Sequence, residues 1–186
     1  MTELIIRPAQ GQEAAAIAAL VNRAYRGESS RAGWTTEADL LDGKRTTAEE
    51  VMALLARDDI QILTGWVASQ LMVTLCAERH GSHHSVHQSV QQAVHLGMIA
   101  VEPTQQNRGY GKKIILAAEQ WALAHWQASV SQMAVVSLRR ELIAFYQRLG
   151  YQPTGEVRPF PYQPAMWQAK VENMQLLTLQ KPLGVN

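Results

Sequence analysis

A strand that leads through a two-glycine turn directly into a long helix is the feature that most constrains this chain. Residues 93–101 are mostly apolar and are followed by Pro103, and an amphipathic helix is predicted over 112–127. Between them lie Gly109 and Gly111, which lack the Cβ atoms that would keep a ligand from the backbone. The free N–H groups and positive dipole end of a helix's first turn bind anions. The turn therefore predicts a phosphate-binding site.

The spacing of the glycines excludes two common phosphate-binding loops. A Walker A loop needs G-x-x-x-x-G-K-[ST], whereas the glycines here are two positions apart. A dinucleotide-binding fingerprint needs G-x-G-x-x-G, but Ile114 stands at the third glycine position. The pattern Q/R-x-x-G-x-G/A fits instead, and Gln106, Gly109 and Gly111 fill it.

The hydrophobic periodicity along the chain predicts a single domain, 1–186, in which strands alternate with helices. Strands are predicted over 4–8, 60–67, 71–78, 93–101, 133–138, 151–156 and 173–180. Helices are predicted over 12–25, 47–57, 112–127 and 141–149, with one or two further turns at 36–39. Loops are expected over 79–92 and 157–168. The order of the main elements, βααβββαβαββ, is that of an α/β (α+β) fold.

The glycine turn and the segment Phe145–Tyr151 together resemble the two signatures of the GCN5-related N-acetyltransferase (GNAT) superfamily. The second signature is a helical tyrosine, here Tyr146, four residues before Gly-[Phe/Tyr]. The resemblance covers essentially the whole chain and implies a mixed, mostly antiparallel sheet of about seven strands, splayed between the fourth and fifth. One departure concerns the Asn often found seven residues before the tyrosine, because Arg139 stands there.

The resemblance implies that acetyl-CoA is the cosubstrate. Backbone groups of the strand before the turn would pair with the pantetheine arm, and amides from Asn107 to Lys112 would hold the pyrophosphate. A backbone N–H near Ile99 would stabilise the oxyanion of the thioester. The implied coenzyme-binding residues are Ile99, Ala100, Val101, Gln106, Asn107, Arg108, Gly109, Tyr110, Gly111 and Lys112.

The resemblance also implies catalytic roles. Tyr146 would protonate the leaving thiolate or hydrogen-bond to it. The acceptor amine must lose a proton before it attacks, and a Glu accepts this proton in the histone-acetyltransferase branch. Counting back from the glycine motif places His95 at that position, and histidine titrates near neutral pH. Glu78, at the end of the preceding strand, is the alternative base.

The acceptor side is expected in the segment after the first helix. Trp34 would provide an apolar wall, and Glu37 would attract an ammonium group, as Glu28, Asp39 or Asp42 also would. Aromatic residues of the 157–167 loop would form the opposite wall; they are Phe160, Tyr162 and Trp167.

The expected function is therefore acetyl transfer from acetyl-CoA to a primary amine of a small molecule or peptide, by direct attack in a ternary complex. The alternative is a non-catalytic acyl-CoA-binding sensor with the same fold. The sequence leaves open the acceptor, the acyl-chain preference, the base, and whether the protein is a monomer or a homodimer.

Composition narrows the possible partners and location. Seventeen Lys and Arg against 16 Asp and Glu give a net charge of +1, which argues against a nucleic-acid partner. We expect no membrane segment, because no apolar run reaches ~18 residues. The absence of a signal-peptide pattern and the single Cys76 favour the cytoplasm. No metal is expected, although one loop holds His80, His83, His84 and His87.

Overall fold

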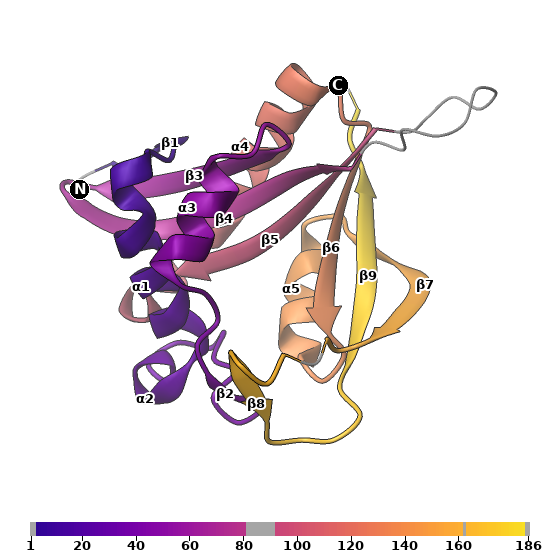
Figure 1. Cartoon of the computed structure of the whole chain (residues 1–186). Helices are drawn as coiled ribbons and strands as arrows, with labels where there is room; N and C mark the ends of the chain where they lie inside the picture. Colours follow the sequence, from indigo (N-terminus) through magenta and orange to yellow (C-terminus); the bar gives the residue numbers. More distant parts are fainter. Residues whose placement is uncertain (1–2, 81–91, 162, 185–186) are drawn as a thin grey trace.

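The protein is described here by a computed structural model over residues 3–80, 92–161 and 163–184. A seven-stranded mixed sheet forms its centre, in the order β1-β3-β4-β5-β6-β9-β7 (Figure 1). The strands are β1 (Ile5–Pro8), β3 (Ile60–Val67), β4 (Gln70–His80), β5 (Ala93–Val101), β6 (Val130–Val136), β7 (Gln152–Pro159) and β9 (Gln175–Pro182). Every neighbouring pair is antiparallel except β5–β6. The predicted mostly antiparallel sheet of about seven strands is confirmed.

Helices cover both faces of the sheet, because alternating strand side chains point to opposite sides. On one face lie α1 (Ala14–Tyr25), which follows the short 3-10 turn η1 (Gly11–Glu13), and α3 (Ala48–Leu55). The other face carries α4 (Tyr110–Trp126) and α5 (Arg140–Arg148). Cys76 packs with α1, while its neighbours Leu75 and Ala77 pack in the core beneath α4.

The sheet opens between β5 and β6, as the family resemblance implies. Their parallel pairing runs only from Ala93 opposite Val130 to His95 opposite Gln132. Beyond that point the two strands diverge (Figure 1). Residues 96–101 therefore present a backbone edge that β6 does not pair with. His95 is the last residue of β5 before the gap begins.

A β-bulge distorts β5 beside this gap. Thr74 pairs with Ala100 and Cys76 pairs with Gly97, so Met98 and Ile99 together face a single residue of β4. Met98 has a left-handed backbone, with φ +48°. A residue other than glycine is rarely held in that conformation unless the surroundings impose it, and such strain is concentrated at functional sites. The bulge redirects the backbone groups that follow Met98.

The start of α3 confirms a prediction from the sequence. The Thr47 side chain accepts a hydrogen bond from the Glu50 N–H at 3.2 Å, and the Glu50 carboxylate accepts one from the Thr47 N–H at 3.0 Å. This reciprocal pair is the capping box that the spacing of the two residues indicated. It satisfies backbone donors that a helix start otherwise leaves free.

Three short elements differ from the prediction. The helix of one or two turns expected at 36–39 is wrong: Thr36 and Glu37 have no regular structure and the next residues form a turn, while the helical turn is α2 (Gly27–Ser30). A two-stranded sheet joins β2 (Leu41–Gly43) to β8 (Trp167–Ala169). No strand was predicted at either place, and β8 lies at the end of the predicted 157–168 loop. A Cβ on Gly43 would lie 2.2 Å from the Met166 carbonyl oxygen, so the close approach of these segments needs glycine.

No helix among the described residues is both long and apolar enough to cross a membrane. Of the four loop histidines, His80 ends β4, while His83, His84 and His87 lie outside the described residues.

Candidate functional site

Two cavities meet where the sheet splays open. The strand-gap cavity, of about 490 Å³, lies between β5 and β6 and extends to β2–β8 and β7. The glycine-turn cavity, of about 550 Å³, lies between the turn before α4 and the helix α5. Four residues line both cavities: Tyr25, Ile99, Leu142 and Tyr146. Two ligands that entered from opposite sides would meet at these residues.

The turn before α4 is shaped to bind an anion. Asn107 and Gly109 both have left-handed backbones, with φ +67° and +78°. Gly109 is the N-cap of α4, and the first intrahelical bond runs from the Lys113 N–H to its carbonyl at 3.0 Å. The amides of the residues between them are the donors that a helix start leaves free. Lys112 and Arg148 add positive charge to the same cavity.

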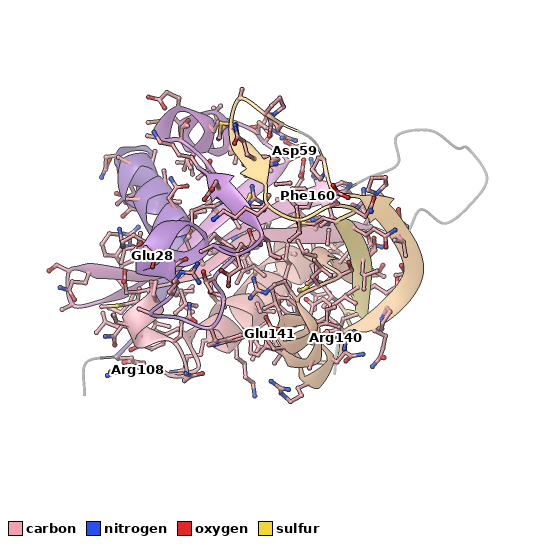
Figure 2. All side chains as sticks on the ribbon, turned by 90° about the horizontal axis from the view of Figure 1, so that it is seen from below. Glu28, Asp59, Arg108, Arg140, Glu141 and Phe160 are labelled. Carbon is pink, nitrogen blue, oxygen red and sulfur yellow. The ribbon has the colours of Figure 1, made fainter. Side chains whose placement is uncertain are left out.

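Eight of the ten residues expected to bind the coenzyme line this cavity; the exceptions are Ala100 and Arg108. The Ala100 side chain is buried against α1, so only its backbone faces the sheet edge. Arg108 is exposed, at the outer end of the turn (Figure 2).

The Gln106 side chain braces a neighbouring loop. Its oxygen accepts a hydrogen bond from the Trp34 N–H at 2.8 Å, and its amide nitrogen donates to the Thr35 hydroxyl at 2.7 Å and to the Val101 carbonyl at 3.4 Å. A Cβ on Gly33 would lie 2.6 Å from this side chain. Gln106 therefore connects the end of β5 to the loop at 33–35.

Tyr25 fixes the bulged segment of β5. Its phenol donates a hydrogen bond to the Ile99 carbonyl at 2.6 Å, across the boundary between the cavities. Burial raises the pKa of Tyr25 to about 12, and the charge of Glu37 acts in the same direction. Tyr25 therefore remains a donor at physiological pH. The sequence reasoning missed it, because a tyrosine at the end of α1 carries no signal of its contact with β5.

Tyr146 lies at the junction of the two cavities and is 5% exposed. Among the described residues, its hydroxyl has no hydrogen-bond partner, and it is not enclosed by protein. Burial, reinforced by Tyr25, raises the pKa of Tyr146 well above its usual value. The phenol is therefore protonated across the physiological range and is available as a hydrogen-bond donor to a group beside it.

His95 and Glu78 are paired across β4 and β5, and both line the strand-gap cavity. Burial lowers the pKa of His95, and the neighbouring His80 lowers it further, while Glu78 acts in the opposite direction. The imidazole is thus neutral near pH 7 and able to accept a proton. The Glu78 carboxylate is already engaged by the Arg57 guanidinium at 2.7 Å. The structure brings the two alternative bases together, and within the described residues the His95 side chain has no hydrogen-bond partner.

The residues expected at the acceptor side are divided between the cavities. Trp34 lies beside Phe145, with 5.6 Å between ring centroids, and lines the glycine-turn cavity rather than the strand gap. Glu37 lines the strand-gap cavity, but its carboxylate is buried in an ion pair with Arg26. From the opposite loop, Phe160 and Trp167 line the strand-gap cavity. Tyr162 lies outside the described residues.

Arg139, the departure from the family pattern, ties the loop at 34–35 to the start of α5. Its guanidinium donates to the carbonyls of Thr35 and Trp34 at 3.1 and 3.2 Å, and to the Glu141 carboxylate at 2.8 Å. The residues at the start of α5 lie along one rim in Figure 2, where Arg140 and Glu141 are labelled. The sequence marked this position as unusual but did not indicate its role.

Solved structures of similar fold include several acetyltransferases. An acetyltransferase of the GNAT family from Streptococcus pneumoniae is 20% identical, with a TM-score of 0.65, and the alignment covers 98% of this chain and 100% of that one. NAA60 of Arabidopsis thaliana in complex with acetyl-CoA is 12% identical, with a TM-score of 0.72 and coverage of 97% and 99%. A ribosomal-protein-alanine N-acetyltransferase from Brucella melitensis is 16% identical, with a TM-score of 0.67 and coverage of 96% and 99%. At these identities the likeness establishes the fold.

No curated protein matches the chain in sequence. The model of the acetyltransferase (GNAT) family does match it, over residues 15–151. This span runs from the start of α1 through the glycine turn and Tyr146 to Tyr151, and it covers well over half of the chain. The chain therefore belongs to the acetyltransferase (GNAT) family.

Proposed function

We propose that this protein is an N-acetyltransferase that transfers the acetyl group of acetyl-CoA to a primary amine in a ternary complex. The observation that carries the proposal is that two cavities, one with a phosphate-type turn and one without, meet at Ile99 and Tyr146. Family membership and the acetyl-CoA bound to the NAA60 structure support the choice of cosubstrate. We propose further that residues 1–186 form one domain and act in the cytoplasm.

The glycine-turn cavity fits the coenzyme by the chemistry of its groups. Free amides at the start of α4, together with Lys112, suit a pyrophosphate. The edge of β5 that β6 leaves unpaired offers backbone partners for the amides of a pantetheine arm. Phe145 and Leu142 supply apolar contacts along the way to the junction. When bound, the coenzyme supplies an activated acetyl thioester.

Three groups at the junction then assist the transfer. The Ile99 N–H, redirected by the bulge, would donate to the carbonyl oxygen as the amine attacks. Tyr146 would hydrogen-bond to the departing thiolate or protonate it. His95 would accept the proton that the amine loses, either directly or through water. The last two roles are supported by burial, which keeps the Tyr146 phenol protonated and the His95 imidazole neutral near pH 7.

A thiol-release assay over a broad panel of primary amines tests the proposed function. We expect acetyl-CoA-dependent thiol release with at least one amine, and stabilisation of the protein by coenzyme A in a thermal-shift titration. Stabilisation without turnover on any amine would favour the non-catalytic sensor. Stabilisation by ATP or NAD but not by coenzyme A would contradict the assignment of the glycine turn.

The pH dependence of the saturated rate distinguishes the two candidate bases. Because burial lowers the pKa of His95, kcat should stay constant as the pH is lowered past about 6.5, the usual pKa of histidine. It should fall only at lower pH, where His95 becomes protonated and can no longer accept a proton. His95→Gln should lower kcat by roughly 100-fold and remove this acid limb. Glu78→Gln, the matched variant on the paired strand, should keep the limb. If Glu78→Gln removes the limb and His95→Gln retains it, Glu78 is the base.

A further inference from the structure

The charges on the walls of the strand-gap cavity are mostly positive. The arginines that line it are Arg26, Arg45, Arg139 and Arg158, whereas its carboxylates are Glu37 and Glu78. A cavity that binds a simple alkylammonium group is expected to offer a free carboxylate. Whether the strand-gap cavity offers a free carboxylate depends on the ion pairs that Glu37 and Glu78 make.

Neither carboxylate in the cavity is free. Glu37 is buried against Arg26, and Glu78 is held by Arg57, which lies outside the cavity wall. The other acids near the acceptor side are paired as well, each on the protein surface: Glu28 and Asp39 with Arg31, and Asp42 with Lys170. The cavity therefore offers little attraction for a cationic group.

Arg45 is the arginine of this cavity that has no counter-ion among the residues that the structure describes. Among residues 3–80, 92–161 and 163–184, no carboxylate lies within ion-pair distance of its guanidinium, although the residue is only partly exposed. Its charge lowers the pKa values of Tyr25 and Cys76, so the guanidinium lies near both residues. Two other arginines of the cavity have partners. Arg139 pairs with Glu141 and donates to two backbone carbonyls, and the exposed Arg158 pairs with Glu156.

The backbone that carries Arg45 is firmly held. The Asn22 side chain accepts hydrogen bonds from the N–H groups of Arg45 and Thr46, at 2.7 and 3.3 Å, and donates to the Thr46 carbonyl at 2.9 Å. The Lys44 N–H donates to the Met166 carbonyl at 3.0 Å. These bonds attach the segment both to α1 and to the loop before β8, so the guanidinium is presented from a fixed base.

A second donor on the same wall also lacks a partner. The Arg26 side chain is 5% exposed, and its Nε has no hydrogen-bond acceptor among the described residues. The remaining surface is largely apolar, with Met133, Val135, Phe160 and Trp167 among its residues. The cavity thus combines an apolar body with two cationic donors, the Arg45 guanidinium and the Arg26 Nε, that have no acceptor in the described part of the chain.

We infer, building on the proposed acetyltransferase function, that the acceptor is an amino acid with an apolar side chain, and that Arg45 binds its carboxylate. The planar guanidinium fork matches a carboxylate in a two-point hydrogen-bonded pair. The apolar wall receives the side chain, and the amine is left toward His95 and Tyr146. Arg45 is accordingly a specificity-determining residue for the acceptor.

Matched acceptors test the inference. L-Phenylalanine, L-phenylalaninamide and 2-phenylethylamine share the aromatic group, but only the first carries a carboxylate. We expect kcat/KM for L-phenylalanine to exceed that of both others by at least about 10-fold. A preference for the amide or for 2-phenylethylamine would overturn the inference and leave the proposed acetyl transfer intact.

Variants of Arg45 provide the second arm. Arg45→Met should raise KM for L-phenylalanine by about 10- to 100-fold and leave KM for acetyl-CoA and turnover of 2-phenylethylamine unchanged. Arg45→Lys should raise KM for L-phenylalanine less than Arg45→Met does, because lysine keeps the positive charge but lacks the two-point donor geometry of the guanidinium. Arg31→Met, a surface arginine with two ion pairs, is the control and should behave as wild type. An unchanged KM in Arg45→Met would overturn the inference.

A binding measurement separates this inference from the proposed function. Calorimetric titration with N-acetyl-L-phenylalanine, the expected product, needs no catalysis. Binding that Arg45→Met abolishes, in a protein that releases no thiol with any amine, would support the carboxylate site and contradict the enzyme. Absence of binding to the wild type would overturn the carboxylate site even if other amines are acetylated.

Discussion

Tyr146→Phe is expected to lower kcat by about 10²- to 10⁴-fold while coenzyme A affinity stays within a few-fold of wild type. The phenol lies at the junction of the two cavities, and burial raises its pKa, so the hydroxyl stays protonated and can donate a hydrogen bond there. A departing thiolate would accept this bond, which would stabilise its charge as it leaves. Because the hydroxyl has no hydrogen-bond partner in the described part of the protein, its removal leaves no unsatisfied group. The fold should therefore be unaffected.

Tyr151→Phe is the matched control for this variant. Tyr151 is fully buried and hydrogen-bonds to Ser131 and Glu119, both at 2.7 Å, away from both cavities. Removing this hydroxyl should lower the melting temperature of the protein and leave kcat near the wild-type value. Steady-state kinetics with calorimetric binding of coenzyme A measure both outcomes. If Tyr146→Phe turns over at the wild-type rate, Tyr146 neither hydrogen-bonds to the departing thiolate nor protonates it.

Elements whose signal is local were predicted well from the sequence. The strands at 60–67 and 93–101 match the predicted bounds, because their apolar runs are long and end at turns. The capping box before α3 and the turn at Gly109 also depend only on neighbouring residues. By contrast, β2 and β8 are three residues each and form through pairing between distant segments. Propensity has too little weight over so short a stretch to indicate them.

In the candidate site, too, residues that belong to local motifs were predicted, whereas residues placed by tertiary packing were not. The glycine turn and Tyr146 belong to contiguous motifs, and the structure places both on one cavity. Tyr25 and Arg45 belong to no motif, and their placement depends on how α1 and the segment after β2 pack on the sheet. Glu37 illustrates the limit most clearly. Its charge suggested an ammonium site, but its ion pair with Arg26 is a tertiary contact that sequence spacing does not indicate.

Gly109→Glu is expected to weaken coenzyme A binding by about 100-fold or more. The left-handed backbone at this N-cap, φ +78°, disfavours any side chain, which disturbs the amides that follow it. The added carboxylate would also stand next to the pyrophosphate. Two unit charges 4 Å apart interact by about 1 kcal/mol in water and about 4 kcal/mol near a protein surface, so repulsion alone accounts for most of the loss.

Two further variants separate strain from charge at this turn. Gly109→Ala introduces the backbone strain without the charge, and no atom lies within 4 Å of the added Cβ, so it should weaken binding only several-fold. Gly155→Glu places the same carboxylate at a similar left-handed position, φ +87°, on β7 at the far edge of the sheet (Figure 1). It should destabilise the protein slightly and leave coenzyme A affinity unchanged. Because only Gly109→Glu combines the charge with the helix start, calorimetric titration of all three isolates the pyrophosphate contact. Equal affinities in Gly109→Glu and Gly155→Glu would place the pyrophosphate elsewhere.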